Sequence, residues 1–262
     1  MQSQQLEVIG AHQAKSNDQF KQDFDRLSNN RLGAILKKAN SNTLNSMKFA
    51  HYLPIYEELF AKLNIGSVKM LEVGIQHGGS YRLWSNFFGR ELLDWTGLDI
   101  DRRCEALNER LDKMEGKVLI GSQSDPSFLN TVISERGPFD VVIDDGSHRS
   151  DDIIAAFQVL SSAVKPGGFY VIEDVHACYW DGFRGKGEFS NAVSYFQGLV
   201  HSLNQFAVRH ARVSSALSSD ERVAAPSNIR RIDFHPSMIV CEMGELDPLI
   251  EWKSGAKSIL RA

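Results

Sequence analysis

Short apolar runs alternate with helical patterns between residues 68 and 174, and this alternation limits the possible folds more than any other feature. The runs are VKMLEVGI (68–75), DWTGLDI (94–100), KVLIG (117–121), FDVVID (139–144) and GGFYVIED (167–174). Runs this apolar are typical of strands buried on both faces of a parallel sheet. Their alternation with helices predicts right-handed βαβ units in a doubly wound α/β sheet.

The segments on either side of these runs complete the predicted architecture. Residues 229–244 contain two further strand-like runs, joined by a tight connection at Pro236-Ser237, which predict a closing antiparallel pair. Five parallel strands and this pair make a seven-stranded, Rossmann-like sheet, which we assign to a domain at residues 67–262. Residues 1–66 are polar and helix-prone, and we expect a helical appendage that serves the acceptor side or oligomer contacts.

Composition excludes several classes of partner. The net charge of −4 argues against a general nucleic-acid binder, which is usually basic. No apolar run approaches the ~18 residues that a membrane span needs, and the polar start lacks the features of a signal peptide. The three cysteines are far apart and predict reduced thiols rather than a disulfide framework. We therefore expect a cytoplasmic protein that acts on small molecules and binds neither membrane nor nucleic acid.

The loop LEVGIQHGGS (71–80) places glycines directly after the first strand, where a ligand can approach the backbone closely. A dinucleotide fingerprint is excluded because Gln76 replaces its middle glycine. The spacing E-x-G-x-x-x-G-G instead resembles the first motif of class I S-adenosylmethionine-dependent methyltransferases. A plain strand-to-helix turn is the alternative. The candidate cofactor-binding residues in this loop are Glu72, Gly74, Gly78 and Ser80.

The next two strand ends supply further cofactor candidates. Asp99 stands near the end of the second strand, where a carboxylate can accept the hydroxyls of a ribose. It can instead cap the following helix, and Asp101 competes for either role. After the third strand, Gln123 and Ser124 could reach an adenine edge or form an ordinary helix-capping turn.

The fourth and fifth runs each end in two adjacent acids, Asp144-Asp145 and Glu173-Asp174. Four carboxylates at neighbouring strand ends would repel one another unless a divalent cation lay between them. All-oxygen ligands favour Mg²⁺, with Mn²⁺ as the second candidate. We expect Asp145, Glu173 and Asp174 to be the ligands. The strand pleat turns Asp144 to another side, so we group it with the cofactor-binding residues. Helix capping and ion pairing are the alternative roles for these acids.

His148 follows the first acidic pair by three residues and is our candidate for the general base. Together with Asp145 it forms the predicted catalytic pair. His176, three residues after Glu173, is the second candidate for the base. A capping or surface role is the alternative for a lone histidine near a helix start.

At this point the chain resembles the metal-dependent sugar O-methyltransferases of the mycinamicin and macrocin type, whose cephalosporin hydroxylase-like relatives have a similar core. The matching segments are HYLPIYEELF (51–60), LEVGIQHGGSYRLW (71–84), TGLDID (96–101), GSQSDP (121–126), IDDGSH (143–148) and GGFYVIEDVHACYW (167–180). The resemblance implies Mg²⁺ bound by Asp145, Glu173 and Asp174, His148 as the base, Asp99 at the ribose and Glu72 at the methionine end of the cofactor. One departure is Ser122, where the family usually has aspartate.

The predicted function is transfer of a methyl group from S-adenosylmethionine to a sugar hydroxyl of a glycosylated natural product or saccharide. A divalent ion would bind two vicinal hydroxyls while His148 removes a proton. The residues expected to contact the acceptor are Tyr52, Tyr56, His176, Tyr179 and Trp180. One alternative is methylation of a catechol-like or other vicinal diol, and another is a non-catalytic S-adenosylmethionine-binding protein. Family precedent and the helical appendage predict a homo-oligomer.

Overall fold

The computed structural model describes residues 17–40, 42–63, 66–111, 116–187, 191–204 and 228–248, with residues 250, 252 and 254. The part of the predicted N-terminal helical segment at residues 1–16 lies outside these residues. In the part described, no helix is both long and apolar enough to cross a membrane.

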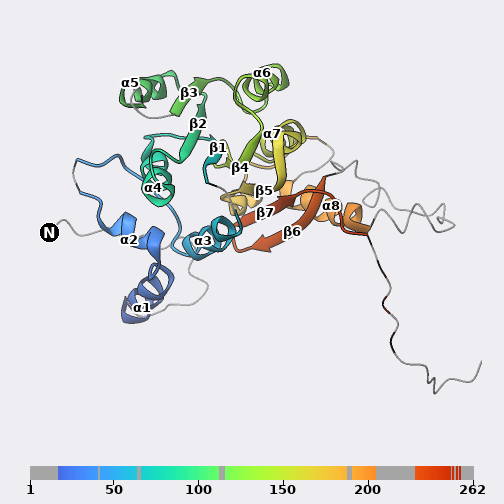
Figure 1. The fold of residues 1–262 in the computed structure, drawn as a ribbon, viewed down its shortest axis with the longest axis horizontal. Helices are drawn as coiled ribbons and strands as arrows, with labels where there is room; N and C mark the ends of the chain where they lie inside the picture. The colour runs from blue at the N-terminus through green and yellow to red at the C-terminus, as the bar shows by residue number, and fades with distance from the viewer. Residues whose placement is uncertain are drawn as a thin grey trace, which may run out of the picture.

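The centre of the molecule is a seven-stranded sheet of order β3-β2-β1-β4-β5-β7-β6 (Figure 1). Its strands are β1 (Val68–Val73), β2 (Leu93–Asp99), β3 (Gly116–Ile120), β4 (Phe139–Asp144), β5 (Val164–Ile172), β6 (Ile229–His235) and β7 (Met238–Met243). Strands β1 to β5 are parallel, whereas β7 runs antiparallel to both β5 and β6. The predicted fold class is confirmed.

Strand β5 begins earlier than the sequence indicates. The apolar run was expected to start at residue 167, but Val164 already pairs with Phe139 of β4. A register irregularity follows this pair, so the Pro-Gly-Gly stretch lies within the strand and not before it. Proline lacks an N–H group, which makes such an irregular stretch a suitable place for Pro166.

Helices cover both faces of the sheet (Figure 1). One face carries α2 (Arg31–Lys37), α3 (Tyr52–Lys62) and α4 (Gly79–Phe88), and the other carries α6 (Pro126–Arg136), α7 (Ser150–Leu160) and α8 (Ala192–Leu199). The remaining helical segments are α1 (Asn17–Leu27), α5 (Asn108–Leu111) and the 3-10 turns Arg102–Leu107, Ser161–Ala163, Val175–Tyr179 and Val200–Asn204.

The two faces bury two separate hydrophobic cores, because successive side chains of a strand point to opposite sides. Leu71 of β1 packs into the core of α7 and α8 with Phe157 and Phe196. The preceding residue, Met70, packs into the other core with Tyr56 of α3 and Trp84 of α4. This double burial explains why the strand sequences are apolar without alternation.

Helix α3 is part of the second core and not a peripheral element. Its buried residues are Tyr52, Leu53, Tyr56, Leu59 and Phe60, which recur at helical spacing on one face. The domain boundary at residue 66 stays a prediction, but α3 shares its apolar contacts with the strands that follow this boundary.

The register of the sheet aligns the ends of its central strands. Asp144 of β4 pairs with Val73 of β1 on one side and with Ile172 of β5 on the other. The residues directly after these strands, including Asp145 and Glu173, therefore leave the sheet at the same edge.

Replacing Leu53 with alanine tests whether α3 belongs to the core. Leu53 is 2% exposed, and truncation of such a leucine should lower the free energy of unfolding by about 2–5 kcal/mol. Urea unfolding of Leu53→Ala measures this loss. The exposed Glu58 on the same helix supplies the control Glu58→Ala, which should remain within about 1 kcal/mol of the unmodified protein. Equal losses for both variants would contradict the packing.

Candidate active site

A pocket of about 370 Å³ lies along the carboxyl ends of the central strands. Seven of the residues expected at the site line it: Gly74, Ser80, Asp99, Gln123, Asp145, His148 and Asp174. In an open α/β sheet this edge is where ligands bind. The structure thus brings the predicted cofactor loop and the predicted metal site to one pocket.

The loop after β1 leaves no room for side chains at its glycines. Gly74 has a φ of +81°, and a Cβ there would lie 2.1 Å from the backbone oxygen of Asp145. Gly78 has a φ of +71° and precedes the first turn of α4, to which it offers no capping side chain. Because the first backbone N–H groups of a helix lack partners within it, this turn suits an anionic group such as a carboxylate. The loop therefore fits the amino-acid end of S-adenosylmethionine.

Glu72 lies beneath the pocket and not on its wall. Its side chain is completely buried, and Trp95 Nε1 donates to its Oε2 at 3.0 Å. Burial raises the pKa of Glu72, and the positive charge of Lys48 acts to lower it. Its Oε1 has no hydrogen-bond partner among the described residues. Glu72 is not among the residues that line the pocket, and its expected contact with the cofactor stays a prediction.

Asp99 holds the cofactor loop in shape. Its Oδ2 accepts the backbone N–H groups of Ile75 and Gln76, both at 3.0 Å, and its Oδ1 accepts that of Asp101 at 2.9 Å. A carboxylate has about four acceptor positions, so one remains for a ligand hydroxyl. Asp101 instead accepts from the Arg103 backbone and side chain, and it caps the following turn. Asp99 is therefore the better placed of the two for a ribose.

Gln123 and Asp144 support the loop that carries the second group of acids. The Gln123 side chain donates to Asp144 Oδ1 at 3.1 Å and accepts from the Ser147 backbone at 2.7 Å. Asp144 is 1% exposed and is not among the residues that line the pocket, and its grouping with the cofactor-binding residues stays a prediction. Burial raises the pKa of Asp144 to about 7. Ser124 also lies outside the lining, whereas Gln123 and Ser122 belong to it.

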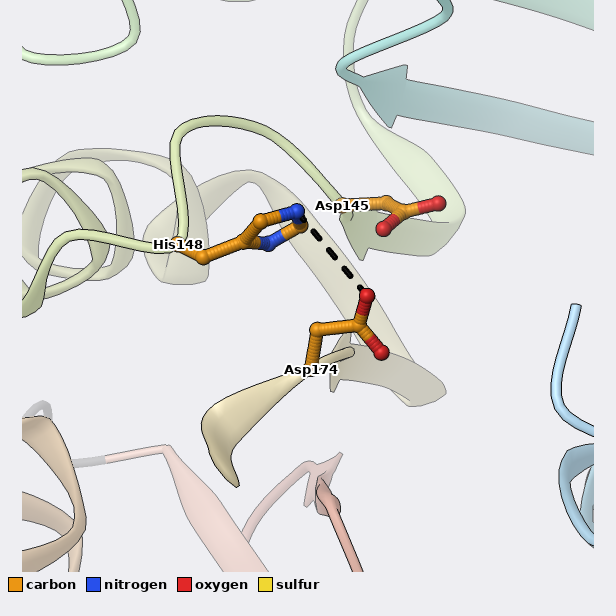
Figure 2. A group of neighbouring side chains, drawn as sticks. All are labelled: Asp145, His148 and Asp174. Carbon is orange, nitrogen blue, oxygen red and sulfur yellow. Dashed lines mark ion pairs between the residues drawn. The ribbon is translucent and has the colours of Figure 1, made fainter. Parts of the chain in front are cut away.

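Two of the predicted ligands and the candidate base converge in the lining of the pocket, and Figure 2 shows their side chains. One oxygen each of Asp145 and Asp174 and a ring nitrogen of His148 all lie within 4.8 Å of one another. His148 Nε2 is 3.9 Å from Asp174 Oδ2. All three side chains are half-buried, so water can complete a coordination shell. Two carboxylates with open positions fit Mg²⁺ or Mn²⁺.

The backbone is strained where these side chains are presented. His148 and Asp174 have φ values of +57° and +56°, in the left-handed region that residues other than glycine rarely adopt. Such conformations concentrate at functional sites because the surrounding structure must impose them.

Glu173, the third predicted ligand, is held by two other side chains. Lys48 Nζ donates to Glu173 Oε1 at 2.7 Å and to Asp145 Oδ2 at 2.6 Å. Tyr56 donates to the same oxygen of Glu173 at 2.5 Å. Burial pushes the pKa of Glu173 up, Asp145 adds to the rise, and Lys48 opposes it. The assignment of Glu173 as a metal ligand stays a prediction.

Lys48 is the functional residue that the sequence analysis missed. Its side chain is 2% exposed. Burial lowers its pKa, but the nearby carboxylates outweigh burial and raise it above the ordinary value, so the ammonium stays charged. The only signal in the sequence was a basic residue shortly before Tyr52 and Tyr56, which were themselves expected near the site. Asn45, Ser46 and Met47 line the pocket beside it.

Tyr52 and Tyr56 are buried and hydrogen-bonded to acids of the site. They are 1% and 0% exposed, and their expected contact with the acceptor stays a prediction. The Tyr52 hydroxyl lies 2.8 Å from both Asp174 Oδ1 and the backbone oxygen of Ser237.

The aromatic loop at residues 176–187 remains accessible. Tyr179 and Trp180 are 65% and 47% exposed, and the Trp180 ring packs edge-on against His176 with centroids 5.0 Å apart. The His176 ring is hydrogen-bonded through Nδ1 to the Ser237 hydroxyl. Because Ser150 N donates to Phe183 O at 2.9 Å, the loop is attached to the start of α7.

A family model described as a methyltransferase domain matches residues 71–175, which contain the cofactor loop and both acidic pairs. Residues 71–175 are therefore similar to a methyltransferase domain, and this stretch contains most of the strand ends that line the pocket.

The chain is also similar to two curated proteins. It is 39% identical over 159 residues to the demethylmacrocin O-methyltransferase of Streptomyces fradiae, covering 58% of this chain and 38% of that protein. It is 35% identical over 175 residues to the mycinamicin VI 2''-O-methyltransferase of Micromonospora griseorubida, covering 64% of this chain and 42% of that protein. The chain thus spans about two fifths of the length of these relatives.

A solved methyltransferase structure has a similar fold. The MycE methyltransferase from the mycinamycin biosynthetic pathway, in complex with Mg and SAH, superposes with a TM-score of 0.62 at 27% sequence identity. The match covers 85% of this chain and 55% of that one. Together with the family match, it confirms the resemblance drawn from the sequence.

The raised pKa of Asp144 predicts a measurable pH dependence of stability. Between its ordinary value of 3.8 and about 7 the folded protein holds a proton that the unfolded chain has released, so this carboxyl lowers stability as pH rises through that window. Asp144→Asn keeps an acceptor for Gln123 but carries no charge. Its stability relative to the unmodified protein should increase between pH 5 and pH 8, by about 1 kcal/mol or more.

Urea unfolding at the two pH values measures this change for Asp144→Asn. Asp181→Asn, at an exposed position, removes one carboxylate without burial and should leave the pH dependence unaltered. A stability difference for Asp144→Asn that is equal at both pH values would contradict the raised pKa.

Proposed function

We propose that the chain is a divalent-metal-dependent O-methyltransferase that transfers the methyl group of S-adenosylmethionine to a sugar hydroxyl of a glycoside or saccharide. The observation that carries the proposal is the convergence of Asp145, His148 and Asp174 at one end of a pocket whose other walls include Gly74 and Asp99. A methyl donor and a cation-bound acceptor can be held side by side in this arrangement.

The cofactor side of the pocket suits S-adenosylmethionine. The glycines after β1 let a ligand approach the backbone, the first turn of α4 offers N–H groups to a carboxylate, and Asp99 keeps one acceptor position for a ribose hydroxyl. The cofactor supplies an electrophilic methyl group when bound. Support for this choice comes from the MycE complex, which contains SAH.

The acidic end of the pocket suits Mg²⁺ or Mn²⁺. Asp145 and Asp174 would hold the ion, with Glu173 behind them, and the ion would lower the pKa of a hydroxyl bound to it. The same MycE complex contains Mg.

His148 would remove the proton of the acceptor. Its Nε2 lies 3.9 Å from Asp174 Oδ2, and this carboxylate can orient the imidazole (Figure 2). His176 is less well placed, because its Nδ1 is engaged by the Ser237 hydroxyl.

A sugar acceptor is favoured by the curated relatives, whose names describe methyl transfer to macrolides or to rhamnosyl tetracenomycins. The exposed rings of Tyr179 and Trp180 lie on the loop that begins directly after Val175, close in sequence to Asp174. Such rings offer apolar surface and a polar edge to an amphipathic ligand such as a sugar. The homo-oligomeric state stays a prediction.

A panel of acceptors tests the reaction. Glycosylated macrolides, other glycosides and catechols are incubated with the full chain and S-adenosylmethionine, with Mg²⁺ or with a chelator, and the products are read by mass spectrometry. We expect a mass increase of one methyl group on a glycoside, lost on chelation. Transfer to catechols alone would mean that the acceptor is another kind of vicinal diol and not a sugar. Cofactor binding without transfer to any acceptor would contradict an enzymatic role.

Replacing His148 with alanine tests the general base. Loss of such a base should lower kcat by about 10²–10⁴-fold, while the Kd for S-adenosylmethionine changes little. Steady-state kinetics with the acceptor found above measures kcat, and calorimetry measures cofactor binding. His176→Ala is the matched comparison and should have the smaller effect on kcat. A larger loss for His176→Ala than for His148→Ala would reverse the assignment.

A further inference from the structure

A buried lysine lies between two of the acids assigned to the metal. Lys48 Nζ is 2.6 Å from Asp145 Oδ2 and 2.7 Å from Glu173 Oε1, and its side chain is 2% exposed. Glu72, a third buried acid, also contributes to the electrostatic stabilisation of the ammonium. The Lys48 ammonium is therefore the positive charge that balances the acidic side chains at the strand ends.

The ammonium occupies the position that a cation bridging Asp145 and Glu173 would need. A divalent ion of the Mg²⁺ type binds carboxylate oxygens at about 2.0–2.1 Å, which is closer than an ammonium approaches. An ion bound through the two oxygens that Lys48 now contacts would therefore displace the ammonium. A positive charge this close also disfavours a second cation in a site of low dielectric constant.

We propose that Lys48 is an internal cation that competes with the divalent ion for Asp145 and Glu173, so that binding of the ion and the present position of Lys48 exclude each other. This inference rests on the proposed function, because it assumes that the acidic end of the pocket binds a metal. Lys48 does not contact Asp174 at hydrogen-bond distance, and the Asp174 Oδ2, on the side of His148, can receive the ion first while Oδ1 keeps its hydrogen bond from Tyr52.

The chain around Lys48 can accommodate this exchange. Residues 44–49 contain neither helix nor strand, and the neighbouring Met47 is 70% exposed. The same stretch forms one wall of the pocket through Asn45, Ser46 and Met47. Departure of Lys48 would therefore also move a wall of the cofactor pocket, which links metal occupancy to the shape of the cofactor site.

Direct metal titration of Lys48→Met tests the competition. The full chain is titrated with Mn²⁺ alone, and the Kd is measured by electron paramagnetic resonance of the free ion. Removing the competing charge should lower the Kd about tenfold or more, within the usual range of coupling between two ligands. A Kd equal to that of the unmodified protein, or a higher one, would overturn the proposal.

Lys165→Met is the matched control. Lys165 Nζ lies 2.9 Å from both oxygens of Asp140, which stands at the opposite end of the strand that leads to Asp145. The control changes the net charge equally and also removes a lysine from a strand carboxylate. Its Kd for Mn²⁺ should stay within about twofold of that of the unmodified protein, because salt in the buffer screens the effect of distant charges on the metal site. An equal gain in both variants would assign the effect to overall charge and overturn the proposal.

Hydrogen exchange of the unmodified protein gives a readout that needs no variant. Amides of residues 44–49 should exchange faster with saturating Mg²⁺ than without it, since Lys48 no longer fixes the segment. Unchanged or slower exchange would overturn the proposal even if Lys48→Met failed to fold.

The titration also separates this proposal from the proposed function. If neither the unmodified chain nor Lys48→Met bound Mn²⁺, the metal site itself would be wrong. Mn²⁺ binding to the unmodified chain, with no gain in Lys48→Met, would leave the metal site intact and overturn only the competition.

Discussion

The ends of neighbouring parallel strands carry buried negative charge, and the surrounding structure must supply positive charge and hydrogen-bond donors to balance it. The register of β1, β4 and β5 brings Asp145 and Glu173 out of the sheet at one edge, where burial makes unpaired carboxylates unfavourable. Lys48 supplies the positive charge, and Tyr56 supplies a further donor. Both come from a segment that the sequence suggested was an appendage, so the N-terminal region completes the charge balance of the sheet edge.

Much of the fold could be predicted because its signals are local. Apolar runs of strand length indicate burial on both faces of the sheet, and glycines after the first strand indicate a tight turn. The acidic pairs could be placed together as well, since the ends of parallel strands meet at one edge. The convergence of Asp145 and Asp174 needed only the order of the strands.

Contacts between the N-terminal segment and the edge of the sheet could not be predicted. Lys48 bonds to residues 97 and 125 positions away, and a single lysine before an aromatic segment carries no sign of such partners. Tyr52 and Tyr56 were expected near the site, but the sequence does not distinguish a ring that faces a ligand from one that is hydrogen-bonded to an acid. The sequence also gives no sign of the left-handed backbone at His148 and Asp174, because neither residue type requires this conformation and tertiary contacts impose it.

The contact between Gly74 and Asp145 has a mechanical consequence. The backbones of the loop after β1 and the loop after β4 are in direct contact, with no space for even a methyl group between Gly74 and Asp145. Neither loop can shift toward the other without a steric clash. A displacement of the loop after β1 toward the acidic side chains would therefore have to displace the loop after β4 as well, through backbone contact alone.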